Sequence, residues 1–103
     1  AADDTRAPAP RATARVDAIR GALTAEQLAS AIPRGALDAC DAGDGELPIR
    51  MRIARDGRAT ARARRGTIRD RAAILCITSA LGAQRFPTTT GVTRATITVT
   101  TAR

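Results

Sequence analysis

The strongest constraint on the fold is an alternation of apolar and polar side chains in residues 47–64, on both sides of an Asp56-Gly57 pair. Alternation with a period of two places every second side chain on the same face of a β-strand. An Asp-Gly pair accepts the positive backbone angles that a tight hairpin turn needs. The segment therefore predicts an antiparallel hairpin whose buried face is Leu, Ile and Met on the first strand and alanine alone on the second.

A helical segment precedes this hairpin. Thr24 and Gln27 form a capping-box pattern, in which each side chain can bond to the backbone N–H of the other residue, so a helix is expected to begin there. Apolar residues follow at helical spacing as far as Cys40, but Pro33 and Gly35 interrupt them. We therefore expect a kinked helix or two short helices in this region.

A second helix and a final strand complete the pattern. The T-x-x-D motif at residues 67–70 predicts a helix start, and a broad apolar stripe continues from Ile68 to Leu81. Residues 93–101 alternate again, which predicts a strand. The order α-β-β-α-β indicates an α+β domain, a three-stranded antiparallel sheet packed on two helices. The final strand should pair with the first strand, so that residues 59–63 and 93–101 lie at the two edges.

Residues 1–22 lack a comparable pattern. The segment AADDTRAPAP combines Pro, Ala and charge, which is typical of a flexible or polyproline leader. Residues 11–20 predict at most a weak helical turn or two, carrying Val16 and Ile19. We place the domain at residues 23–103 and treat residues 1–22 as a flexible or weakly helical leader.

The composition limits the chemistry of this chain of 103 residues. Histidine is absent from the sequence, which removes the commonest general base and the commonest metal ligand. The acidic residues between positions 38 and 46 do not have the spacing of a calcium-binding loop. We therefore expect a protein that is not an enzyme, with no metal and no cofactor. No run approaches 18 consecutive apolar residues, so no membrane span is expected in this chain.

The net charge is +7, and all 17 basic residues are arginine. Such a charge indicates an anionic partner, or else a coding bias toward Ala, Arg and Gly. Phe86 is the only aromatic residue, and nucleic-acid binders of this size usually add stacking aromatics, so nucleic acid is not the expected partner. One predicted sheet face gathers five arginines, which form either a solvated face or a surface for carboxylates or phosphates: Arg50, Arg52, Arg62, Arg64 and Arg94.

The two cysteines, Cys40 and Cys76, are too few for a metal site, so they form either two buried thiols or one disulfide. A disulfide is the favoured interpretation, because a bridge over so long a loop would contribute roughly 4 kcal/mol to a small core. It would place the protein in the periplasm or outside the cell. The opening Ala-Ala-Asp-Asp suits a mature chain whose signal peptide has been removed.

Four segments then follow in a recognisable order: LTAEQLASAI with ALDAC, GELPIRMRIARDGRATARARRGTI, AILCITSALGAQRFP and ATITVTTAR. Over residues 24–103 this order resembles the TonB C-terminal-domain family, most closely the cysteine-containing branch of myxobacterial gliding-motility proteins. In that branch one cysteine ends the first helix and another lies in the second helix before an Arg-Phe-Pro, and Cys40, Cys76 and residues 85–87 match these places. The resemblance implies a non-catalytic periplasmic fold that binds a segment of an outer-membrane protein as an added strand.

The predicted partner site is therefore the final strand, where an unpaired edge could accept a partner strand. The alternative is an ordinary terminal strand whose threonines favour extended backbone. We expect an adaptor or accessory subunit of a cell-envelope complex, which could also form a homo-oligomer or a larger assembly. The second hypothesis is a basic module that binds nucleic acid or an envelope polymer through the arginine face. The strand residues assigned to the partner site are Thr93, Arg94, Thr96, Thr98 and Thr100.

Overall fold

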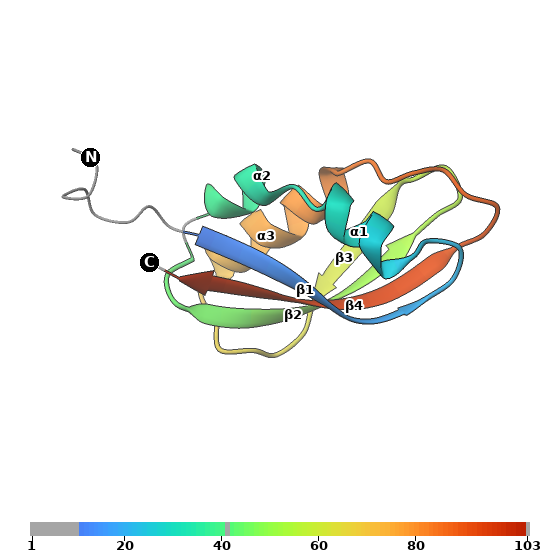
Figure 1. Ribbon diagram of the computed structural model, residues 1–103. Coiled ribbons are helices and arrows are strands. Elements are labelled where there is room, and N and C mark those ends of the chain that lie inside the picture. The colour runs from blue at the N-terminus through green and yellow to red at the C-terminus, as the bar shows by residue number, and fades with distance from the viewer. Residues whose placement is uncertain (1–10, 41, 103) are drawn as a thin grey trace, which may run out of the picture.

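The computed structural model describes residues 11–40 and 42–102. Within them, four strands form one sheet, and three helices lie together on one of its faces (Figure 1). The strands are β1 (Arg11–Arg20), β2 (Gly45–Ile53), β3 (Ala59–Ala63) and β4 (Thr93–Ala102), and the helices are α1 (Ala25–Ala31), α2 (Arg34–Asp38) and α3 (Arg71–Ala83). The predicted α+β class with an antiparallel sheet is confirmed, but the predicted three-stranded sheet is wrong, because a fourth strand precedes the first helix.

The strand order across the sheet is β1-β4-β2-β3, and every neighbouring pair is antiparallel. The β2–β3 pairing is the predicted hairpin, with Ile49 opposite Ala63. On the other side of β2, Ile49 lies opposite Ile97, and both side chains are fully buried at the centre of the sheet. Strand β4 pairs with both β1 and β2, so the prediction that residues 93–101 form a free edge is wrong.

Strand β1 replaces the weak helix that was expected in residues 11–20. Its register against β4 shifts between Val16 and Ala18, so Asp17 forms a bulge. The bulge lets Val16 lie opposite Ile97 and Ile19 opposite Ala95, so both side chains remain on the face that packs against the core. A spacing of three residues, which the sequence pattern assigned to a helix, is thus produced by a strand with one extra residue. Residues 1–10 of the expected leader lie outside the described residues.

The first helical segment is interrupted where the sequence predicted it. Thr24 caps α1 through both bonds of the capping box with Gln27. Helix α1 ends before Ile32, whose backbone is extended, and α2 begins after Pro33, so the two-helix alternative is confirmed. Helix α3 begins at Arg71, later than the motif suggested, because the side chain of Asp70 accepts a hydrogen bond from the backbone N–H of Ala72 and forms the N-cap.

The core is a single layer between the helices and the covered face of the sheet. Leu28 of α1, Leu37 of α2 and Ile77 of α3 are fully buried against the apolar row of β2 and β4. The hairpin turn is joined to the segment that follows α3, because the backbone N–H of Phe86 donates a hydrogen bond to the carbonyl of Gly57 at 3.0 Å. Gly57 has a φ of +87°, and a Cβ there would lie 2.1 Å from the Phe86 carbonyl oxygen, so only glycine fits.

The two cysteines form a disulfide, and their Cα atoms are 5.6 Å apart. Cys40 follows α2 and Cys76 lies within α3, so the bridge joins two helices that cover the same face of the sheet. The favoured interpretation of the cysteine pair is therefore confirmed. Because α2 is only five residues long, this covalent bond and the burial of Leu37 contribute to holding it over the sheet.

Candidate anion-binding surface

The face of the sheet opposite the helices carries an open depression of about 610 Å³. Its rim and walls include side chains from all four strands, from Ala18 in β1 to Thr60 in β3. Five exposed arginines line it, and we call this group the arginine depression: Arg20, Arg50, Arg52, Arg62 and Arg94. Since strands twist and alternate their side chains, arginines that are far apart in the sequence meet on this one surface.

The register places these arginines directly opposite one another. Arg94 of β4 lies between Arg20 of β1 and Arg52 of β2, which makes a row of three across adjacent strands. In the neighbouring row, Arg50 of β2 lies opposite Arg62 of β3. Directly opposed residues of an antiparallel pair have Cβ atoms about 5 Å apart, and like charges at that distance destabilise the sheet. The cluster therefore carries an electrostatic cost that an anion would relieve.

Carboxylates of the described chain do not neutralise the depression. No acidic residue lines it, and the two ion pairs found among the described residues lie elsewhere, at Arg15–Asp17 and Arg58–Asp56. Arginine remains protonated at any physiological pH and offers five N–H donors in a planar fork. The depression thus presents many donors, fixed positive charge and no group that could act as a general acid or base.

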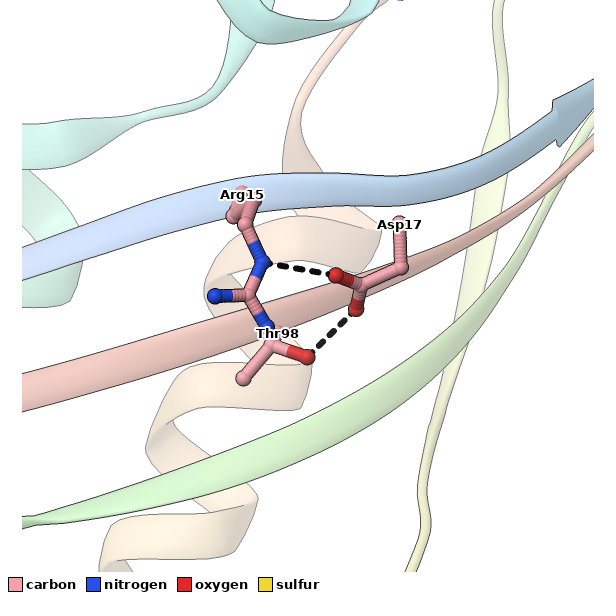
Figure 2. A network of polar contacts seen from close by, with 3 residues as sticks. All are labelled: Arg15, Asp17 and Thr98. Carbon is pink, nitrogen blue, oxygen red and sulfur yellow. Dashed lines mark hydrogen bonds and ion pairs between the residues drawn. The ribbon is translucent and has the colours of Figure 1, made fainter.

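At the other end of the same face, one arginine is paired with a carboxylate of the protein itself. Figure 2 shows Asp17, on the bulge of β1, between Arg15 and Thr98: its carboxylate accepts one hydrogen bond from the Arg15 guanidinium at 2.7 Å and another from the Thr98 hydroxyl. The hydrogen bond from Thr98, and then the one from Arg15, hold the pKa of Asp17 below its usual value. The same contact raises the pKa of Arg15. Arg15 thus has a carboxylate partner inside the protein, which the arginines of the depression do not have among the described residues.

Four of the five arginines predicted for this face are brought together. Arg64 is exposed but lies beyond the end of β3, where its backbone N–H donates to the Pro48 carbonyl, and it does not line the depression. Arg20 was missed by the sequence reasoning, because residues 11–20 were not interpreted as a strand. The alternation of Ala12, Ala14 and Val16 is the signal that could have found it.

The threonines predicted as a partner site are mostly unavailable. Thr93 is fully buried on the helix-covered face, where its hydroxyl accepts a hydrogen bond from the backbone N–H of Leu23. Thr98 is buried beneath Asp17, and Thr96 and Thr100 are half-buried. Arg94 alone of the predicted residues of this strand is exposed, and it belongs to the arginine depression.

The two true edges of the sheet differ. The edge of β1 is partly closed, because the backbone N–H of Ala12 donates to the Asp38 carboxylate at 2.6 Å and Asp17 interrupts the strand with a bulge. On the two sides of β3, the backbone N–H of Arg64 donates to the Pro48 carbonyl and the backbone N–H of Ala54 donates to the Arg58 carbonyl. These two hydrogen bonds fix which residues of β3, in alternation, direct their backbone N–H and C=O groups toward β2. This alternation turns the backbone groups of Ala59, Ala61 and Ala63 away from β2, and no partner for them is found in the described part of the chain.

Within residues 11–40 and 42–102 no group of three or more acidic or cysteine side chains is placed to hold a metal ion. No helix in the same part of the chain is long and apolar enough to cross a membrane. Comparisons with protein-family models, with curated proteins and with solved structures found no match for this chain.

Proposed function

We propose that the protein is a non-catalytic binding module that holds an acidic partner in the arginine depression. The observation that carries this proposal is the pair of like-charged rows, Arg20–Arg94–Arg52 and Arg50–Arg62, with no carboxylate beside them in the described chain. Repulsion between these arginines destabilises the free protein, and a bound anion would offset that repulsion. Guanidinium groups bind carboxylates and phosphates through paired hydrogen bonds, so the ligand carries one of these groups.

The place of action that fits this proposal is the periplasm or the exterior of the cell. Disulfides persist in oxidising compartments and are rare in the cytosol, and the Cys40–Cys76 bridge is part of the fold. A role as an adaptor or accessory subunit of an envelope complex fits such a location. The expected similarity to the TonB C-terminal-domain family stays a prediction of the sequence.

The test is a titration with two simple anions, inorganic triphosphate and hexaglutamate, at 20 and 300 mM NaCl. We expect both to bind, with an affinity that falls steeply as salt rises. Arg94→Gln, at the centre of the longer row, should weaken binding at least fivefold. The matched control is Arg85→Gln, which removes the same charge from an exposed residue outside the depression and should change affinity less than twofold. Equal losses in the two variants, or no binding at low salt, would contradict the proposal.

A second candidate function is strand addition at β3. The unpartnered backbone groups of Ala59, Ala61 and Ala63 are the observation that favours it, and they replace the predicted site on the interior strand β4. A peptide strand could pair with these groups and extend the sheet. This keeps the expected adaptor role and moves the binding strand to a real edge.

Proline substitution separates this candidate from the first one. Ala61→Pro removes an outward N–H and leaves the ladder with β2 intact, whereas Thr60→Pro removes an N–H that faces β2. With a copurifying partner, Ala61→Pro should abolish capture while circular dichroism and the thermal midpoint stay near those of the wild type. Unchanged capture by a folded Ala61→Pro variant would rule out strand addition at β3.

A further inference from the structure

The register of the arginines across the sheet narrows the range of ligands that the arginine depression can hold. Arg50 faces Arg62, and Arg52 faces Arg94, so two facing pairs lie side by side on the sheet. In each pair the Cβ atoms are about 5 Å apart, a separation at which two long arginine side chains can donate to the same carboxylate. Each pair is therefore a clamp for one carboxylate.

The two clamps are offset by two residues along β2, which is about 7 Å, and by one strand spacing across the sheet. Their centres consequently lie about 8 Å apart. In an extended peptide, side chains at positions i and i+2 point to the same side and are separated by about 7 Å, while neighbouring side chains point to opposite sides. Two glutamates at i and i+2 can therefore reach both clamps, and two adjacent glutamates cannot do so from an extended backbone.

The remaining lining of the depression suits a peptide backbone. The lining residues whose side chains share this face with the arginines are small, namely Ala18, Thr60 and Thr96, and they allow a close approach. Ile19, Met51 and Ala95 also line the depression, but their side chains lie on the core face. The only aromatic residue of the chain, Phe86, is 4% exposed and does not line the depression. Stacking of nucleic-acid bases on an aromatic platform is thus not provided at this surface. Charge and shape together favour an acidic protein segment over a nucleic acid.

We infer that the arginine depression binds an extended acidic segment of a partner protein, with carboxylates at positions i and i+2 held by the Arg50–Arg62 and Arg52–Arg94 clamps. This inference rests on the proposed function, to which it adds the chemistry and the spacing of the ligand. Arg20 extends the second clamp, because it lies on the side of Arg94 away from Arg52 and can donate hydrogen bonds to a third carboxylate of the segment.

The test uses two peptides of the same composition, acetylated and amidated at their ends. One is Thr-Glu-Thr-Glu-Thr, and the other is Thr-Thr-Glu-Glu-Thr, in which the two glutamates are adjacent. We expect the first peptide to bind at least fivefold more tightly in an NMR titration of the disulfide-bonded protein at 50 mM NaCl. Amide shifts should concentrate in β2 and β4, on both sides of the two clamps.

Three variants check the assignment. Arg50→Gln and Arg94→Gln each disable one clamp and should reduce the difference between the peptides to less than twofold, while Arg85→Gln should preserve it. Equal affinity of the wild type for both peptides would overturn the spacing, and triphosphate binding would show that the proposed function still holds. Absence of binding to every anion would overturn both. Tighter binding of a ten-residue oligothymidylate than of either peptide would overturn the assignment to a protein partner.

Discussion

The carboxylate of Asp38 accepts a hydrogen bond of 2.6 Å from the backbone N–H of Ala12, which lies on the free edge of β1. Asp38 is the last residue of α2, and the disulfide at Cys40 follows two residues later. One short helix, fixed covalently to α3, therefore blocks the end of an edge that could otherwise pair with another chain.

Asp38→Ala should destabilise the protein by about 1.5 kcal/mol, because the Ala12 N–H loses a charged acceptor in a partly buried position. Urea denaturation measures this loss. The freed edge should also promote self-association, which sedimentation velocity at increasing protein concentration would detect. Asp38→Asn keeps an acceptor oxygen and is the matched control. An Asp38→Ala protein as stable and as monomeric as the wild type would show that the contact does not protect the edge.

Removal of the disulfide should lower the free energy of unfolding by about 4 kcal/mol, since the bridge closes a loop with a sequence separation of 36 residues. The comparison is urea denaturation of the wild type and of the Cys40→Ser, Cys76→Ser double variant. Dithiothreitol should shift the midpoint of the wild type toward that of the variant, and it should leave the variant unchanged. A variant that unfolds at the wild-type urea concentration would contradict this account of α2 and α3.

Arg94→Thr should stabilise the free protein by about 0.5 kcal/mol, because it removes one of three charges in the row with Arg20 and Arg52. The same variant should bind triphosphate at least fivefold more weakly. Thermal denaturation and the titration thus move in opposite directions, which a purely structural role of Arg94 does not predict. The gain in stability should shrink at 1 M NaCl, where screening already weakens the repulsion. A loss of stability at low salt would contradict the repulsion on which the proposed function depends.

Thr98→Val should raise the pKa of Asp17 toward its ordinary value, because the hydrogen bond from Thr98 is the largest single cause of the depressed pKa. A carboxyl whose folded-state pKa is lowered stabilises the fold above the unfolded pKa of about 3.9, and this stabilisation is lost as the pH falls through the folded pKa. Carbon-detected NMR titration of the Asp17 carboxyl measures the shift. An unchanged pKa of Asp17 in the Thr98→Val variant would contradict this assignment.

Local patterns predicted most elements of this fold. The alternation in residues 47–53 and the Asp56-Gly57 turn gave the β2–β3 hairpin, and Gly57 has the positive φ that the turn required. The capping box of Thr24 and the break at Pro33 were also predicted correctly. Each of these signals depends on residues that are neighbours in the sequence, so each could be interpreted without knowledge of the fold.

The sequence by itself determined the hairpin, the helix caps, the excess of arginine and the presence of a cysteine pair, because these depend on local backbone preferences and on composition. Only the tertiary structure decided that residues 11–20 form a strand, since the bulge at Asp17 breaks the alternation and the strand exists through its pairing with β4. That one pairing moved β4 from the edge to the interior and placed Arg20 beside Arg94. Long-range register is set by pairing between distant segments, so the local alternation of Ala12, Ala14 and Val16 could suggest a strand but could not place Arg20 beside Arg94.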